Sequence, residues 1–239
     1  MGKHFVLVHG AWHGGWVFDE AIKLLESAGH TAEAPTYPGN SPGEERGGIT
    51  FDIIVDAVVD VLRKQAEPVV LVGHSSAGFV LQAAAPQAAD KIERMVFYNT
   101  FLLPDGKAQF DLVPPEAAEG LSMAAKASPD NSVPVIPEFI RDTLMTGDSQ
   151  TDQDAVMEKC VPQPFALFTT PVKTAPFRAL DIPVSVLFCK DDTSLPPGAY
   201  LGMAQAELGE FNLVKIDGGH ETVFTNPEGW VKGLIQAIP

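Results

Sequence analysis

The sequence predicts an α/β fold built on a parallel sheet that helices cover on both faces. Apolar, β-branched runs of about four to eight residues alternate with amphipathic stretches along most of the 239 residues. The chain is 45% hydrophobic and long enough to bury a full core. It has no internal repeat and no low-complexity tract. We therefore expect one domain that carries an insertion.

Six apolar runs are predicted to be strands, and all six are expected to be parallel. They cover Phe5–Val8, Thr31–Ala34, Val69–Val72, Arg94–Tyr98, Val184–Phe188 and Asn212–Ile216. Five stretches with apolar residues at helical spacing are predicted to be helices. They cover Val17–Ala28, Phe51–Lys64, Ser76–Ala88, Gly198–Leu208 and Pro227–Ala237.

The alternation of strands and helices fails once, between Pro104 and Pro183. This stretch has many prolines, no strand-like run, and short helical patterns at Pro137–Met145 and Asp152–Cys160. About 80 residues are too many for a structureless loop in a compact domain. We expect residues 1–103 and 184–239 to form the core, and residues 104–183 to form a helical lid (cap) inserted into it.

Charge and cysteine content argue against several classes of protein. The net charge is −15 and the 16 basic residues are scattered, which disfavours nucleic acid, anionic membranes and anionic substrates as partners. The N-terminus runs directly into a predicted strand without an export signal, and no apolar run approaches bilayer length, so a cytoplasmic location is expected. Cys160 and Cys189 are too few for a disulfide framework and are expected to be free thiols.

Residues 69–78, VVLVGHSSAG, change from an apolar strand to a serine flanked by small residues and then to a helical pattern. This pattern is typical of a nucleophile elbow, which holds the serine in a strained conformation at the tip of a strand. The residues two before and two after the serine must be small, so that strand and helix can touch. Gly73 and Ala77 meet this need, although the common motif has Gly at the second position. Ser75 is the predicted nucleophile, and an ordinary strand-to-helix turn is the alternative.

Two further strand ends carry the groups that a serine nucleophile needs. In a parallel sheet, ligands bind beyond the carboxyl ends of the strands. The run CKDDTSLP begins at the end of one predicted strand, and DGGH follows another and ends at His220. An imidazole is suited to accept the serine proton, and a buried carboxylate must orient that imidazole. His220 is the predicted base, and the sequence pattern leaves both Asp191 and Asp192 open as the acid.

A glycine-rich run, HGAWHGGW at residues 9–16, follows the first strand. Small residues there let the backbone approach a developing oxyanion, so we predict that the amides of Ala11 and Ser76 form an oxyanion hole. A glycine-rich turn with aromatic anchors is the alternative. The predicted substrate-binding residues are Gly10, Trp12, Phe101, Phe165 and Phe168, with ordinary core packing an equal alternative for the four aromatic ones.

The remaining histidines are not expected to be catalytic. His74 and His9 are expected to brace the backbone rather than transfer protons. His4, His13 and His30 belong to no motif and are expected at the surface or in loops, with His13 next to the pocket.

Five motifs together resemble the α/β-hydrolase branch that contains plant methylesterases, hydroxynitrile lyases and their bacterial relatives. They are HGAWHGGW, GHSSAG, FLLPDG at 101–106, PQPFALFTTPV at 162–172 and GGHETVF at 218–224, and the resemblance covers nearly the whole chain. The chain order Ser, Asp, His is the order that α/β-hydrolases use. The resemblance implies that Ser75 is the nucleophile, His220 the base and Asp192 the acid. The methylesterase acid lies four positions before a proline, as Asp192 lies before Pro196.

The same resemblance argues against a lyase. The related lyases have Thr at the position of Gly10 and, just after the catalytic His, a Lys that stabilises cyanide, where this chain has Glu221. We expect a cofactor-free hydrolase of a small carboxylic ester that needs no metal, and a homodimer is left open. The rivals are a cofactor-free dioxygenase or a C–C bond hydrolase or lyase on this scaffold, and a non-catalytic ligand receptor.

Overall fold

The computed structural model describes residues 2–239 and has a central sheet of six parallel strands in the order β2-β1-β3-β4-β7-β8. The strands are β1 (His4–Val8), β2 (Thr31–Glu33), β3 (Val69–His74), β4 (Ile92–Tyr98), β7 (Val184–Cys189) and β8 (Asn212–Ile216). The six predicted strands and their parallel arrangement are confirmed.

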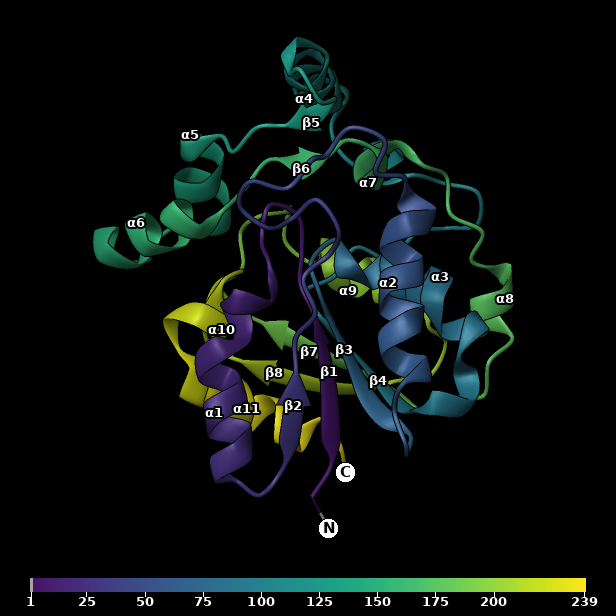
Figure 1. Ribbon diagram of the computed structural model, residues 1–239. Coiled ribbons are helices and arrows are strands. Elements are labelled where there is room, and N and C mark those ends of the chain that lie inside the picture. The colour runs from purple at the N-terminus through teal and green to yellow at the C-terminus, as the bar shows by residue number, and fades with distance from the viewer. Residues whose placement is uncertain (1) are drawn as a thin grey trace.

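Helices cover both faces of this sheet (Figure 1). One face carries α1 (Asp19–Ser27), α10 (Thr222–Thr225) and α11 (Pro227–Gln236), and the other carries α2 (Phe51–Arg63), α3 (Ala77–Ala84), α8 (Ala175–Arg178) and α9 (Ala199–Glu207). Successive strand residues face opposite sides, so Phe5 and Leu7 pack with α1 and α11 while Val6 and Val8 pack with α2 and α3. This two-sided burial explains why the strands are apolar at nearly every position.

Local sequence signals fix several helix ends. The Thr50 hydroxyl accepts a hydrogen bond from the Ile53 amide at the start of α2, and Asn226 caps α11 in the same way. The predicted helix Ser76–Ala88 is shorter than expected, because α3 gives way to a 3₁₀ turn, η2 (Ala85–Gln87), at Pro86. Two further short turns are η1 (Gly15–Phe18) before α1 and η3 (Ala89–Lys91) before β4.

The connection between β4 and β7 is largely helical and lies beyond the carboxyl edge of the sheet (Figure 1). Its elements before α8 are η4 (Gln109–Asp111), α4 (Pro115–Ala127), β5 (Ser132–Val133), α5 (Pro137–Phe139), η5 (Ile140–Leu144), α6 (Gln150–Lys159), β6 (Gln163–Pro164) and α7 (Ala166–Thr169). The expectation that it contains no strand was wrong, because β5 and β6 form an antiparallel pair. The sequence pattern also missed α4, an alanine-rich helix in which only Ala125 is fully buried.

The two ends of this connection are joined beside the sheet. The Val172 amide donates to the Lys107 carbonyl at 2.9 Å, and the Gly106 amide donates to the Val172 carbonyl at 2.8 Å. The Asp105 carboxylate accepts the Thr174 amide at 2.7 Å. The helices in between therefore start and end at one place on the core.

The two cysteines are free thiols, as composition predicted. Burial raises the pKa of Cys189 to about 12, so this thiol stays protonated and unreactive at neutral pH. Within residues 2–239, no helix is both long enough and apolar enough to span a bilayer.

Candidate active site

Ser75 lies at the turn between β3 and α3 with φ = +55°, a left-handed conformation that is strained for a residue other than glycine. A Cβ atom on Gly73 would lie 3.4 Å from the Cβ of Ala77, so strand and helix touch at these two residues. A Cβ on Gly78 would lie only 2.2 Å from the carbonyl oxygen of Phe101. The turn therefore needs a third small residue, which the motif analysis had not recognised.

His220 and Asp192 form a buried pair, with 2.7 Å between Nδ1 of the ring and Oδ2 of the carboxylate. Burial alone would lower the pKa of His220, but the charge and hydrogen bond of Asp192 outweigh it and raise this pKa above its ordinary value. Asp191 is exposed and turns to the neighbouring loop, where its carboxylate accepts the Gly218 amide at 2.8 Å. The structure thus places Asp192, and not Asp191, against His220.

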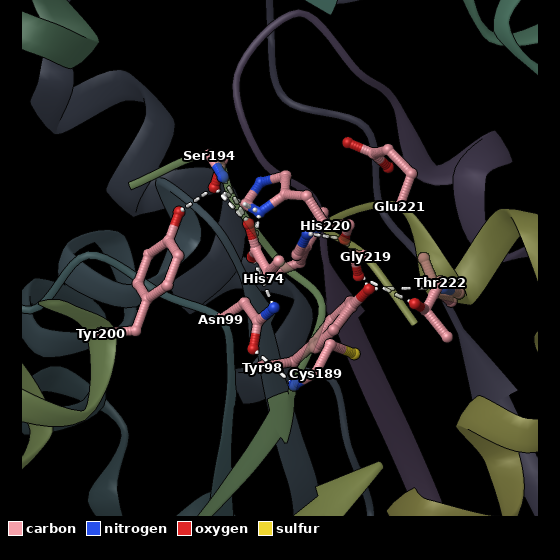
Figure 2. A network of polar contacts seen from close by, with 12 residues as sticks. His74, Tyr98, Asn99, Cys189, Ser194, Tyr200, Gly219, His220, Glu221 and Thr222 are labelled. Carbon is pink, nitrogen blue, oxygen red and sulfur yellow. Dashed lines mark hydrogen bonds and ion pairs between the residues drawn. The ribbon is translucent and has the colours of Figure 1, made fainter. Parts of the chain in front are cut away.

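The Asp192 carboxylate accepts three more hydrogen bonds. Oδ2 accepts the side-chain amide of Asn99 at 2.5 Å, and Oδ1 accepts the Ser194 backbone amide at 2.9 Å and the Ser194 hydroxyl at 2.5 Å (Figure 2). Burial favours the neutral acid, yet His220 and Ser194 lower the pKa of Asp192 and keep it ionised. Sequence reasoning missed Asn99 and Ser194, although each follows the end of one of two adjacent strands, β4 and β7.

The backbone carbonyl of His220 is held by residues at the ends of β3 and β4. Its carbonyl accepts the Tyr98 hydroxyl at 2.6 Å and Nε2 of His74 at 3.0 Å, and the rings of Tyr98 and His74 stack with centroids 4.4 Å apart (Figure 2). Burial, aided by the charge of His220, lowers the pKa of His74, so this ring is neutral. His9 is bonded through both ring nitrogens to backbone groups, and burial lowers its pKa to about 3. Both histidines therefore brace the backbone.

The glycine-rich loop brings Gly10 against Ser75. A Cβ on Gly10 would lie 2.7 Å from the Cβ of Ser75 and 3.3 Å from its Oγ, so only glycine permits this approach. Ala11 and Ser76 line the cavity onto which Ser75 opens. Within residues 2–239, neither amide donates a hydrogen bond to another protein group. Both are free to bind a ligand oxygen, which is what an oxyanion hole requires.

Trp12 fixes the shape of this loop. It has φ = +64°, its amide donates to Oε1 of Gln163 at 2.9 Å, and its carbonyl accepts the Val161 amide at 3.0 Å. The same Gln163 oxygen accepts the side-chain amide of Asn40 at 2.9 Å. The strained loop is thus held by residues around β6, which the sequence pattern could not pair with it.

Ser75 and His220 share a cavity of about 360 Å³, a size suited to a small organic ligand. Of the predicted pocket residues, Gly10, Trp12, Phe101 and Phe168 line it. Phe165 does not line it, and its ring packs edge-on against Phe110, which does. The apolar lining residues that sequence reasoning missed include Phe110, Val113, Ala117, Leu121, Phe139 and Leu144. The spacing of the first four, three or four residues apart, was a helical signal that could have identified them.

Glu221 is fully buried and lines the same cavity. Within the described chain neither of its carboxylate oxygens has a hydrogen-bond partner, and Nε2 of His13 lies 3.4 Å from Oε1 without hydrogen-bond geometry. His13 lies in a loop and lines the cavity, as expected, but it is buried rather than at the surface. Its side chain is 2% exposed, because the glycine-rich loop turns inward and Nδ1 bonds the carbonyl of Ala11 at 2.7 Å.

His74, His220 and Glu221 each have a potential metal-ligand atom, and these atoms lie within 4.8 Å of one another. However, Nε2 of His74 and Nδ1 of His220 are already bonded to the His220 carbonyl and to Asp192. A metal ion would have to take the remaining nitrogen of His220, which is the atom that a general base needs. Metal binding at His220 would thus compete with its use as a base.

Comparisons with known proteins agree with this fold. A sequence model of the alpha/beta hydrolase family matches residues 5–232. A carbendazim-hydrolysing esterase of Nocardioides sp. (strain SG-4G) is 27% identical over 235 residues, which cover 94% of this chain and 95% of that one. The (S)-hydroxynitrile lyase of Manihot esculenta is 39% identical over 106 residues, or 43% of this chain and 41% of the lyase. An extracellular α/β-hydrolase from a Paenibacillus species, described as a structural and functional homologue of tobacco salicylic acid binding protein 2, superposes with a TM-score of 0.92 at 29% identity over 98% of both chains.

Proposed function

Because this chain belongs to the alpha/beta hydrolase family, we propose that it is a cofactor-free serine hydrolase that cleaves a small carboxylic ester. The observation that carries the proposal is the hydrogen bond between Asp192 and His220, on a histidine that shares one cavity with the strained Ser75. Relatives that are esterases, such as the carbendazim-hydrolysing enzyme, support the reaction class.

In the first half of the reaction, the Ser75 hydroxyl attacks the acyl carbon of the ester while Nε2 of His220 takes its proton. Asp192 holds the His220 ring with Nδ1–H toward the carboxylate and stabilises the imidazolium that forms. The negative charge that develops on the carbonyl oxygen is bound by the free amides of Ala11 and Ser76. His220 then gives its proton to the departing alcohol, which leaves an acyl group on Ser75.

In the second half, water replaces the alcohol. His220 removes a proton from the water as it attacks the acyl carbon, and the same two amides bind the oxyanion again. Return of the proton to Ser75 releases the carboxylic acid. No step needs a metal or an organic cofactor.

We also propose that residues 104–183 act as a lid over the sheet. Leu121 of α4 and Leu144 of η5 line the cavity, so this segment supplies much of its apolar wall. The small volume and this wall favour a substrate with a compact, apolar acyl or alcohol group.

Ester hydrolysis is favoured over cyanohydrin cleavage on two observations. Gly10 has no side chain to bind a cyanohydrin oxygen, and the contact with Ser75 leaves no room for one without a backbone shift. Glu221 puts a carboxylate in the cavity where a departing cyanide would need a cation. At about 4 Å, like and opposite charges differ by several kcal/mol at an effective dielectric near 20, or a factor of about 10³ or more in rate.

The test is a panel of aryl and alkyl esters that vary in acyl and alcohol size, run beside cyanide release from mandelonitrile. We expect ester turnover that is lost in Ser75→Ala, and no enzyme-dependent cyanide. A fluorophosphonate should add one label per chain, at Ser75, and Ser76→Ala should still be labelled, since the Ser76 hydroxyl is buried and bonded to Gln109. Labelling at Ser76, no labelling of folded protein, or Ser75-dependent cyanide release comparable to ester hydrolysis would contradict the proposal.

A further inference from the structure

The buried carboxylate of Glu221 is unexplained by the ester hydrolysis proposed above. Both of its oxygens lack a hydrogen-bond partner within residues 2–239, and the residue is 0% exposed. In Figure 2 no dashed line joins the Glu221 carboxylate to the other residues drawn. A buried carboxylate without donors is strongly unfavourable, and native structures rarely leave one without a reason. Since Glu221 lines the cavity, a bound ligand can supply the missing donor.

The surroundings of Glu221 favour a cationic donor. No Lys or Arg is among the described residues that line the cavity. Burial raises the pKa of the nearby Asp148 carboxyl, and the charge of Glu221 raises it further. Burial and the same charge also raise the pKa of the Cys160 thiol. The side chain of His13 lies 3.4 Å away but without hydrogen-bond geometry, and Nδ1 of His220 is already bonded to Asp192. The whole chain carries a net charge of −15, which attracts cations to such a site.

The position of Glu221 indicates which part of a substrate it would contact. A carboxylate oxygen of Glu221 and a ring nitrogen of His220 lie within 4.8 Å of each other. In the mechanism above, His220 delivers its proton to the oxygen of the departing alcohol. A donor bound by Glu221 therefore belongs to the alcohol part of the ester, a few bonds from the ester oxygen.

We propose that Glu221 accepts an N–H hydrogen bond from a protonated amine in the alcohol part of the substrate, and so selects esters of amino alcohols. The inference rests on the proposed ester hydrolysis. The apolar wall holds the acyl group, and the ammonium supplies the hydrogen bond that His13, 3.4 Å away, does not make. A neutral alcohol of the same shape leaves the Glu221 carboxylate without a partner and is a poorer substrate.

The test compares two butanoate esters of nearly equal shape, 2-(dimethylamino)ethyl butanoate and 3-methylbutyl butanoate, at pH 7, where the amine is protonated. Each kcat/KM is divided by the hydroxide-catalysed rate of the same ester, which removes the difference in leaving-group reactivity. We expect the protein to prefer the amino ester by about 10- to 100-fold. Glu221→Gln should bring the ratio close to one. Glu228→Gln, an exposed residue of α11, removes the same unit of charge and should keep the preference, which separates direct contact from long-range attraction.

A second arm measures binding of both esters to Ser75→Ala by calorimetry, with and without Glu221→Gln, after thermal melts show that the variants are folded. This arm reports on Glu221 even if neither ester is turned over. Equal use of the two esters, or a preference that survives Glu221→Gln in turnover or binding, would overturn the role of Glu221. Ester turnover without a preference for the amino ester would rule out this role of Glu221 and leave the proposed ester hydrolysis intact. Amine-dependent binding without any ester turnover would support Glu221 as the binding group and count against the hydrolase.

Discussion

Asn99 and Asp192 are joined by a 2.5 Å hydrogen bond, made to the same carboxylate oxygen that accepts Nδ1 of His220. Asn99 has φ = +40°, and its side-chain oxygen in turn accepts the Cys189 amide at 2.9 Å. One amide side chain thus connects the end of β4, the end of β7 and the acid that orients the base. The strained backbone of Asn99 serves to aim that amide.

Replacing Asn99 by Gly should lower kcat by about 10- to 100-fold with little change in KM, because the amide that positions Asp192 is lost. Glycine accepts the positive φ without strain, so this variant separates the hydrogen bond from the backbone conformation. Steady-state kinetics on the best ester of the panel provide the measurement, with a thermal melt as the folding control. Wild-type kcat in a folded Asn99→Gly protein would show that the amide has no positioning role.

The two adjacent aspartates should respond very differently to neutralisation. Asp192→Asn should reduce turnover by roughly 10⁴-fold, the effect seen when a triad aspartate is neutralised. Asp191→Asn should cost far less, since Asp191 binds only the Gly218 amide at the exposed edge of the loop. The pair forms its own matched control in one esterase assay. A larger loss in Asp191→Asn would move the acid role to that residue.

The pH dependence should follow the raised pKa of His220. Burial works to lower this pKa, but the charge and hydrogen bond of Asp192, and then the charge of Glu221, raise it above 6.5. The base acts when neutral, so kcat/KM should fall as pH drops through a value above 6.5. Glu221→Gln removes one of the raising charges and should move this acid limb to lower pH, measured on a neutral ester. An acid limb below 6.5 in the unchanged protein, or a shift to higher pH in Glu221→Gln, would contradict the electrostatic account.

The close contact at Gly78 predicts a stability effect. Gly78→Ala puts a methyl group 2.2 Å from the Phe101 carbonyl oxygen, so backbone must move, and we expect a loss of about 2 to 4 kcal/mol in the free energy of unfolding. Gly120→Ala, within α4 and with open space around the new methyl, should instead stabilise by about 0.5 to 1 kcal/mol. Denaturant unfolding of both variants gives the comparison. Equal stabilities would mean that the elbow relaxes at no cost.

The six core strands could be predicted because buried parallel strands form unbroken β-branched runs, such as Val69–Val72. The connection between β4 and β7 was harder. Helix α4 is rich in alanine and mostly exposed, so the helical spacing of its few large apolar residues is a weak signal, and β5 is only two residues long. Elements this weak are defined by tertiary contacts rather than by local sequence.

The predicted site residues Ser75 and His220 follow from motifs at strand ends, but their supports do not. Asn99 reaches Asp192 only because β4 and β7 are neighbours in the sheet, and sequence alone does not give strand order. A choice between Asp191 and Asp192 likewise depends on which side chain turns inward. A cytoplasmic location and a homodimer stay predictions, and the Paenibacillus relative is described as extracellular.

The bonds that hold Trp12 have a consequence for altering substrate range. The glycine-rich loop is anchored by Val161 and Gln163, and the base of the connection is closed by Lys107 and Val172. Most of the wall that α4 and η5 supply comes from residues between Lys107 and Val161. We expect that the segment containing α4 and η5 can be exchanged for that of a relative if the bonds at these two places are kept. An exchange that keeps these four residues would vary the shape of the cavity and leave the catalytic residues unaltered.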